Sequence, residues 1–247
     1  MDLKAPPASA RVAQLSTVIL PSGGVNAFED AVARLMRIIK LGIVSEGEQL
    51  PPQRELAEML NISRVTLREA IRALQLAGFV DTRRGRTGGT FVTYAPEKQG
   101  SGNARRLARD MGAGLTDALL FRQVIEPGAA ALAAERVGEA TIDDLRRLAA
   151  VARRAESAKS RMADSRLHLA IADLSGSATL ATAVADVQLR LNDLLAAIPL
   201  MAPAIAHSND QHDEIIGAIE AGDPEQARLS MSTHLAGTAS LLEGFLA

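Results

Sequence analysis

The chain has 247 residues, of which 47% are hydrophobic, 2% are aromatic and none is cysteine, and its formal net charge is −2 at pH 7. This length is sufficient for one large or two ordinary domains, and an apolar content carried by Ala and Leu favours helices over a β-rich fold. The lack of cysteine excludes disulfides and thiolate metal sites. No apolar run is long enough to span a membrane and no signal peptide is evident, so we expect a cytoplasmic protein without a membrane partner.

The first 95 residues predict an arm followed by a small α/β module. Residues 1–26 are rich in Ala, Pro, Ser and Gly and are expected to form a flexible arm. Residues 27–95 predict helices over about 28–42, over 53–60, and from an N-cap at Ser63 to Gly78, because apolar residues recur there at helical spacing. Two β-branched and aromatic runs around a Gly-rich turn in residues 79–94 predict a hairpin. This order of elements predicts a winged helix-turn-helix.

The remaining residues predict a second, helical domain. Residues 96–104 have the composition of a linker, and residues 105–247 predict six or seven helices without a strand. The predicted fold class is therefore mainly α, with an N-terminal winged helix-turn-helix followed by an all-α helical bundle.

Positive charge is concentrated in the winged module, where residues 61–94 contain six Arg against two acidic residues. Arg64, Arg68 and Arg72 repeat every four residues, so they share one face of a helix that fits the major groove. Arginines of the hairpin would contact the DNA backbone or minor groove. The alternative is a solvated Arg face, but the paired short helices and the basic hairpin favour DNA. Because aromatic residues are scarce, we expect double-stranded DNA rather than single strands or RNA loops.

The segment LPPQRELAEMLNISRVTLREAIRALQLAGFVDTRRGRTGGTFV, residues 50–92, resembles the DNA-binding domain of GntR-family transcription regulators. The similarity rests on a Pro, an Arg-Glu-Leu-Ala sequence, a Ser-Arg pair and an Arg-Glu-Ala sequence. Gln53 stands where the family usually has Glu, and the hairpin is longer and richer in Arg than usual. The resemblance, together with the basic hairpin, implies that operator DNA is contacted by Arg54, Ser63, Arg64, Thr66, Arg68, Arg84 and Arg86.

The segment DSRLHLAIADLSGS places Asp164 four residues before His168, so both side chains share a helical face one turn apart. This spacing leaves open a salt bridge, a core histidine with a partner, or half of a metal site. His212 and His234 lie on the apolar faces of later helices and are expected to point inward. Burying three imidazoles and a carboxylate without a common partner would be costly, and a shared divalent ion removes that cost. Such N and O donors suit Zn²⁺ or Ni²⁺.

Three stretches of the helical region resemble the FadR C-terminal domain of the FadR-like branch of that family, namely FRQVIEPGAAALAA, DSRLHLAIADLSGS and QHDEIIGAIEAGDPEQARLSMSTHL. Ser177 stands where Asn is usual. In many members of this branch an Asp and three His bind a divalent metal, which implies Asp164, His168, His212 and His234 here. The resemblance also implies a small carboxylate effector that docks partly on the metal and partly on basic side chains. FadR itself lacks this metal set, so the histidines argue against a long acyl ligand.

Two arginines are candidates for holding the effector carboxylate, because a guanidinium pairs with a carboxylate through two hydrogen bonds. Arg122 is the first, and its alternative role is a surface pair with Glu126 four residues later. Arg190 is the second, and its alternative role is to snorkel from an apolar segment to solvent. His207 matches no motif and is expected in a loop.

These features predict a transcription regulator, and not an enzyme, that acts as a homodimer on a palindromic operator and represses until its effector binds. The rival is a metallohydrolase with a tethered DNA-binding module, but the segments around the four metal candidates offer no further acid with an obvious role as a base. A purely structural metal is a third reading, and it predicts that metal removal unfolds the bundle.

Overall fold

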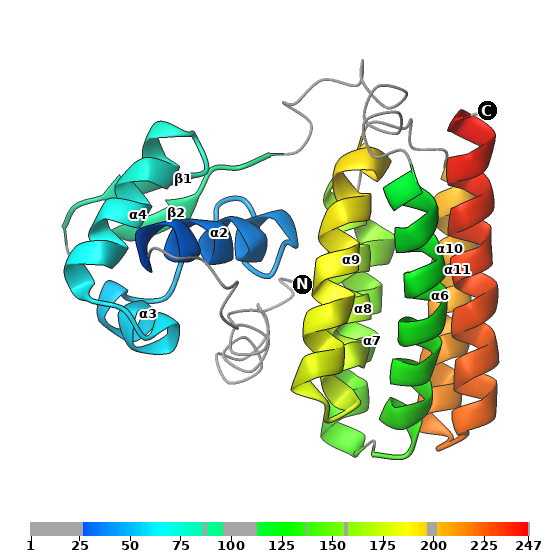
Figure 1. Cartoon of the computed structure of the whole chain (residues 1–247). Coiled ribbons are helices and arrows are strands. Elements are labelled where there is room, and N and C mark those ends of the chain that lie inside the picture. Colours follow the sequence, from blue (N-terminus) through cyan, green and yellow to red (C-terminus); the bar gives the residue numbers. More distant parts are fainter. Residues whose placement is uncertain are drawn as a thin grey trace. The chain divides into compact units, whose positions relative to one another are not determined.

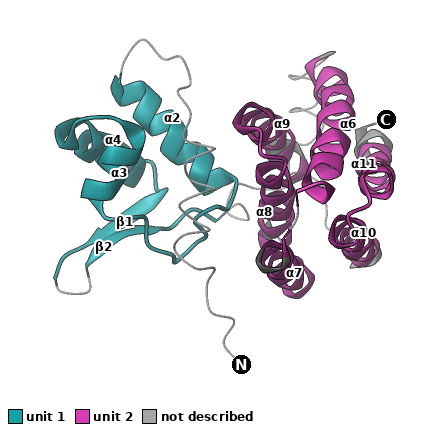
Figure 2. Ribbon diagram, turned by 90° about the horizontal axis from the view of Figure 1, so that it is seen from below, with its two compact units in different colours: residues 1–95 teal, residues 96–247 magenta. Residues whose placement is uncertain are grey.

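The computed structural model describes residues 27–85, 88–95, 113–136, 138–155, 158–196 and 202–246. It divides the chain into two compact units, residues 1–95 and 96–247 (Figure 1, Figure 2). The predicted arm, residues 1–26, and the predicted linker, residues 96–104, lie outside the described residues. A small module of helices with a two-stranded hairpin precedes a helical bundle, which confirms the predicted fold class.

Unit 1 packs three helices beside a hairpin, with the elements α2 (Ala27–Lys40), α3 (Gln53–Leu60), α4 (Arg64–Leu76), β1 (Val80–Arg83) and β2 (Gly89–Val92). The strands are antiparallel, and Val80 lies opposite Val92. Both valines are buried, whereas the middle of β1 faces outward. The hairpin is therefore anchored at the base of its two strands, as expected for a wing.

The turn between α3 and α4 is determined locally. Asn61 ends α3 in the left-handed conformation, with φ 54°, which Asn tolerates better than most residues. The predicted apolar stripe of α4 is buried, and it includes Leu67, Ile71 and Leu74. These side chains join α2 and α3 in one core, so the orientation of α4 is set by its buried face and its opposite face is left at the surface.

Unit 2 consists of α6 (Ala113–Ala134), α7 (Glu139–Arg154), α8 (Ala158–Leu174), α9 (Ala178–Ala196), α10 (Ala202–Glu220) and α11 (Pro224–Leu246). Neighbouring helices form a ring in the order α6, α11, α10, α7, α8 and α9, and α6 also packs directly against α8 (Figure 2). Ala129, Ala130 and Ala133 of α6 are buried, and such small side chains let helices approach closely. None of the described helices has the length and apolar character to cross a bilayer.

The turn between α10 and α11 shows how two helices of the bundle are joined. Gly222 adopts φ 64°, and the next backbone N–H, from Asp223, donates to the carbonyl of Ala218. The Asp223 carboxylate then accepts from the backbone N of Gln226 at 3.0 Å and caps α11. The expected loop at His207 is wrong, because α10 already begins at Ala202.

Candidate functional site

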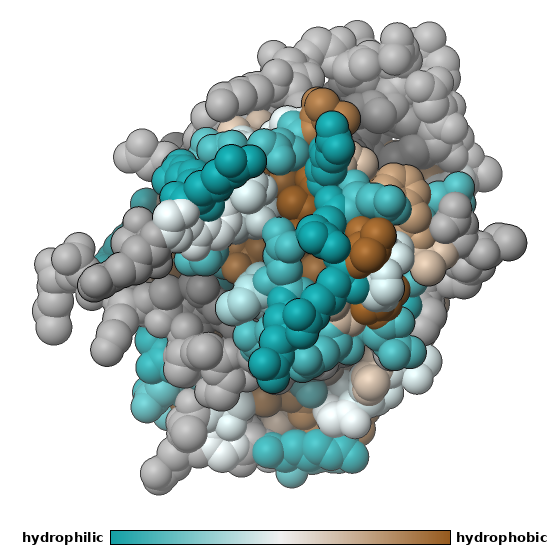
Figure 3. Space-filling model, turned by 90° about the vertical axis from the view of Figure 1, so that its left-hand side faces the viewer, coloured by the Kyte–Doolittle hydropathy of each residue, from teal (hydrophilic) through white to brown (hydrophobic). Residues whose placement is uncertain are grey.

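Three arginines lie on one exposed face of α4. Arg64, Arg68 and Arg72 are all exposed, as their four-residue spacing predicts. Val65 and Leu76 are the exposed large apolar side chains of this helix. The molecular face drawn in Figure 3 is largely hydrophilic, and its hydrophobic side chains form separate spots. An exposed helix face that carries repeated guanidinium groups has the chemistry needed to bind phosphates and guanine edges.

The start of α4 is held by an N-cap. Ser63 Oγ accepts from the backbone N of Thr66 at 3.0 Å and lies 2.8 Å from Thr66 Oγ1. This cap fixes the first turn of the helix and with it the direction in which Arg64 leaves the backbone. Ser63 and Thr66 therefore have a structural role, whatever contacts they make with DNA.

The other predicted DNA contacts lie at separate places in unit 1. Arg54 is exposed on α3 and pairs with Glu58 one turn later, with 3.3 Å between Nε and Oε1. Arg84 is exposed directly after β1. Arg86 lies outside the described residues.

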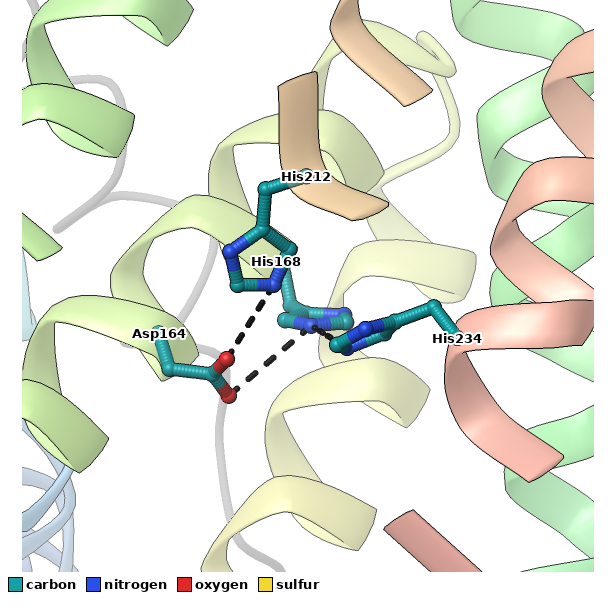
Figure 4. A group of neighbouring side chains, drawn as sticks. All are labelled: Asp164, His168, His212 and His234. Carbon is teal, nitrogen blue, oxygen red and sulfur yellow. Dashed lines mark hydrogen bonds and ion pairs between the residues drawn. The ribbon is translucent and has the colours of Figure 1, made fainter. Parts of the chain in front are cut away.

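Three helices bring Asp164, His168, His212 and His234 together in unit 2 (Figure 4). Asp164 and His168 come from α8, His212 from α10 and His234 from α11. His168 Nε2 lies 3.1 Å from His234 Nε2, and His212 Nε2 lies 3.2 Å from Asp164 Oδ1. The three rings are 2% exposed, and one donor atom from each of the four residues lies within 4.8 Å of the others. Asp164 and His168, one turn apart on α8, thus meet His212 and His234 from later helices.

The electrostatics of the cluster favour metal-binding protonation states. Burial and the neighbouring His168 and His212 rings hold the pKa of His234 well below its usual value, so its imidazole is neutral near pH 7. Burial alone would raise the pKa of Asp164, but the His168 and His212 rings lower it far below its usual range. A neutral imidazole and an ionised carboxylate are the forms in which these groups bind a metal.

The donor set fits a divalent ion. Both ring nitrogens of His212 are buried without a hydrogen bond, although Nε2 lies 3.2 Å from the Asp164 carboxylate, and a buried Nδ1 is costly unless something else satisfies it. Two ligands at about 2.1 Å on opposite sides of one ion lie about 4.2 Å apart and adjacent ligands lie closer, so donor atoms up to 4.8 Å apart must move together when an ion binds. Three imidazole nitrogens and one carboxylate oxygen could therefore hold a divalent metal, with positions left open when the ion takes five or six ligands.

Neither arginine predicted to hold the effector lines the cavity described next. Arg122 is 3% exposed, and its Nε donates to Glu126 Oε1 at 2.7 Å, so the pair with Glu126 forms in the interior and not at the surface. The other carboxylate oxygen of Glu126 contacts His168, so Arg122 belongs to a network that supports the cluster. Arg190 is exposed on α9 and does not line the cavity described next.

A cavity of about 190 Å³ adjoins the cluster, and Asp164 and His234 form part of its wall. Arg161, three residues before Asp164 on α8, also lines it. Burial lowers the pKa of Arg161 to about 10 against the opposing charge of Asp164, so the guanidinium stays protonated near pH 7. His207 also contributes to this wall. Hydroxyl and amide side chains line the rest of it, among them Ser160, Asn192, Ser208 and Thr238.

Sequence reasoning missed several functional candidates. Arg161 carried a usable signal, because it lies one helical turn before Asp164 and so shares its face. Glu126 was considered only as a partner for Arg122, since nothing in the sequence places it beside His168. Gln188 and Gln211 carried no signal, because an amide side chain in a helix is ordinarily a surface residue.

Comparison with known proteins matches both units. Residues 28–92 match the family described as bacterial regulatory proteins, gntR family, and residues 117–237 match the FCD domain. A protein of Mycobacterium gastri described as an HTH-type transcriptional regulator, RmpR, is 33% identical over 212 residues, which cover 83% of this chain and 76% of the relative. The Exu regulon transcriptional regulator of Escherichia coli is 29% identical over 219 residues, covering 87% of this chain and 84% of the relative.

The regulator LutR of Bacillus subtilis is 27% identical over 217 residues, which cover 84% of this chain and 97% of LutR. Among solved structures, Escherichia coli McbR/YncC aligns over 91% of this chain and 100% of its own, with a TM-score of 0.51 and 17% identity. At that identity the structural match concerns the fold.

Proposed function

Because the chain belongs to the GntR family of bacterial regulatory proteins and carries an FCD domain, we propose that it is a repressor whose operator binding is controlled by a small carboxylate that docks beside a divalent metal. It is a DNA-binding transcription regulator and not an enzyme, as its relatives are regulators. The observation that supports control by a ligand is the cluster of Asp164 and three buried histidines, which lies beside a cavity whose wall includes the guanidinium of Arg161.

In the proposed complex with DNA, α4 enters the major groove of operator DNA. Arg64 and Arg68 project from its exposed face and read base edges, since guanidinium binds guanine through two hydrogen bonds. Ser63 and Thr66 at the N-terminus of α4 and Arg54 on α3 contact phosphates. The wing arginines Arg84 and Arg86 contact the backbone or the minor groove.

The metal is proposed to be Zn²⁺ or Ni²⁺, held by Asp164, His168, His212 and His234. Imidazole nitrogens with one carboxylate suit these ions, and no thiolate is available in the chain. When bound, the ion supplies a positive centre with open coordination positions.

The effector is proposed to be a small carboxylate in the adjoining cavity. A cavity of about 190 Å³ has room for a small carboxylate beside the cluster. Arg161, rather than Arg122 or Arg190, is the cation in the wall, and partial burial strengthens its attraction for an anion. Ser160, Asn192 and Ser208 can donate to further oxygens of the ligand.

We propose a homodimer that binds a palindromic operator, because two recognition helices on a two-fold axis match two half-sites. An exposed apolar stripe on α6 supports a second copy of the chain as its partner. Leu120, Phe121 and Val124 are 59%, 46% and 73% exposed at helical spacing. Replacing Val124 with Asp should convert the dimer to monomers in light scattering, whereas Val151→Asp on α7, which packs on α8 and α10, should not.

The first test of the metal is its content in the full chain, purified without a histidine tag, for wild type beside His212→Ala. We expect about one divalent ion per wild-type chain and its loss in the variant. Wild type that holds no ion after incubation with Zn²⁺ or Ni²⁺ would overturn the metal part of the proposal.

The test of the effector uses operator duplex selected from random DNA. Small carboxylates that bind the metal-loaded protein should release the duplex. Replacing Arg161 with Met should weaken carboxylate binding by roughly 10- to 100-fold, as expected for a lost charge-assisted hydrogen bond. Arg190→Met removes an exposed arginine from α9 and is the matched control. Equal carboxylate affinities in wild type and both variants would overturn the role of Arg161.

A further inference from the structure

Two of the three clustered imidazoles have a buried acceptor on the side that faces away from the donor atoms. His168 Nδ1 lies 2.5 Å from Glu126 Oε2, and His234 Nδ1 lies 3.2 Å from Gln211 Oε1. Glu126 is 2% exposed and Gln211 is 7% exposed, so water does not compete for these contacts. Because an ionised carboxylate and an amide oxygen only accept, the hydrogen in each contact belongs to Nδ1 of the ring.

This assignment has a consequence for the other nitrogen of each ring. A neutral imidazole with its hydrogen on Nδ1 presents a lone pair at Nε2. His168 Nε2 and His234 Nε2 lie 3.1 Å apart, so two lone pairs face each other with no hydrogen between them. A cation held by both nitrogens turns this repulsion into attraction.

The carboxylate of Glu126 is itself held in one orientation. Its Oε1 accepts from Arg122 Nε at 2.7 Å and from Gln188 Nε2 at 3.2 Å, which leaves Oε2 for His168. The guanidinium of Arg122, 2.7 Å from Oε1, pairs with Glu126 as an ionised acceptor. Arg122 and Gln188 are 3% and 1% exposed. Arg122, Gln188 and Glu126 therefore form a buried network that ends at His168.

We propose that Glu126 and Gln211 are positioning residues, which hold His168 and His234 in the Nδ1–H tautomer and so direct both Nε2 atoms into the metal site. The proposal rests on the proposed metal site and adds the residues that make its donors ready before the ion arrives. Groups behind metal-binding histidines commonly fix the ring and the tautomer in this way. His212 has no such acceptor among the described residues, and both of its nitrogens are buried without a hydrogen bond.

The decisive variant is Glu126→Gln, which keeps the shape and removes one acceptor oxygen. Arg122 and Gln188 both donate toward Oε1, so the amide oxygen of the variant should turn toward them and its NH₂ toward His168. His168 must then accept at Nδ1 and carry its hydrogen on Nε2, where it blocks the metal. We expect Zn²⁺ affinity, measured by competition with a chromophoric chelator, to fall by roughly 10- to 100-fold.

A merely structural role would lower affinity without changing the tautomer, so the tautomer is measured directly. Long-range nitrogen-proton NMR spectra of the metal-free full chain, at about pH 8 where ordinary histidines are neutral, distinguish the two tautomers, and the chain has four histidines to assign. We expect the Nδ1–H tautomer for His168 in wild type and the Nε2–H tautomer in Glu126→Gln.

Two further variants serve as matched controls. Gln188→Leu disturbs an equally buried position but keeps the carboxylate, so His168 should keep its tautomer. Gln211→Glu keeps an acceptor behind His234 and should preserve Zn²⁺ binding, whereas Gln211→Leu should weaken it. An unchanged His168 tautomer in Glu126→Gln would overturn the proposal. Wild type that binds no Zn²⁺ but shows the expected tautomers would instead contradict the proposed metal function alone.

Discussion

The chain contains two Arg-Glu pairs with the same spacing on two helices, and the two pairs differ in almost every physical respect. Arg54 and Glu58 on α3 have side chains that are 76% and 67% exposed, with 3.3 Å between Nε and Oε1. Arg122 and Glu126 on α6 have side chains that are 3% and 2% exposed, with 2.7 Å between the same atoms. The first pair exchanges readily with water, and the second is part of a fixed network that ends at His168.

This contrast extends to the two units that contain the pairs. In unit 1 the described arginine candidates Arg54, Arg64 and Arg68 are exposed on two consecutive helices, so they are available to an external partner. In unit 2 the three histidines and Arg122 are buried, and the cluster draws on different helices, so Arg122 acts on other side chains. In the proposed function, the same residue type at the same spacing therefore binds DNA in one unit and supports the metal site in the other.

Replacing the arginine of each pair should produce the largest difference in the free energy of unfolding between the two variants. Arg122→Ala leaves the Glu126 charge buried without its partner and should lower the free energy of unfolding by about 3–5 kcal/mol. Arg54→Ala removes a solvated pair and should change it by about 0.5 kcal/mol or less. Urea unfolding of the full chain, followed for the helical signal, measures both. Equal losses of stability in the two variants would contradict the contrast.

Metal removal should lower the stability of unit 2 but not that of unit 1, by less than the Arg122→Ala substitution does. A chelator should remove about 2.7 kcal/mol of stability from unit 2 relative to protein held at a metal concentration of about 100 times Kd, which corresponds to a decrease in Tm of roughly 5–10 °C. The bundle should stay helical, because its apolar core of Leu167, Ile215 and Met231 does not depend on the ion.

Scanning calorimetry and circular dichroism measure this effect, and operator binding by unit 1 in the absence of effector is the internal control. Loss of the helical signal on chelation would favour a purely structural metal over an effector site.

Substitutions on α4 should have the smallest effect on stability while they impair DNA binding. Arg64→Ala and Arg68→Ala should each weaken binding to the selected operator by about 1–3 kcal/mol and leave unfolding nearly unchanged, since both side chains are exposed. Fluorescence anisotropy at a fixed salt concentration measures the loss, and Arg190→Ala on α9 is a control with the same change of charge. An Arg190→Ala variant that loses as much affinity would indicate a non-specific charge effect.

Much of unit 1 could be predicted from the sequence, because its determinants are local. The stripe of Leu67, Ile71 and Leu74 defines which face of α4 is buried, and this places Arg64 and Arg68 at the surface. The helix-turn-helix is made by consecutive residues, so periodicity and the Ser63 cap are sufficient. The metal candidates could also be identified, since their residue types and their resemblance to a known branch selected them.

The support of the metal site could not be predicted, because it depends on which helices become neighbours in the bundle. Glu126 and His168 are 42 residues apart, and they meet only because α6 packs against α8. Arg122 looked equally suited to a surface pair or an effector contact, since helical spacing gives the direction of a side chain and not its burial. The amino-acid sequence by itself determined the two kinds of domain, the exposed face of α4 that carries Arg64 and Arg68, and the four residues that the structure brings together as Asp164, His168, His212 and His234. Tertiary packing decided the burial of Arg122 and the link from Glu126 to His168, because burial and long-range contacts arise only when the helices assemble.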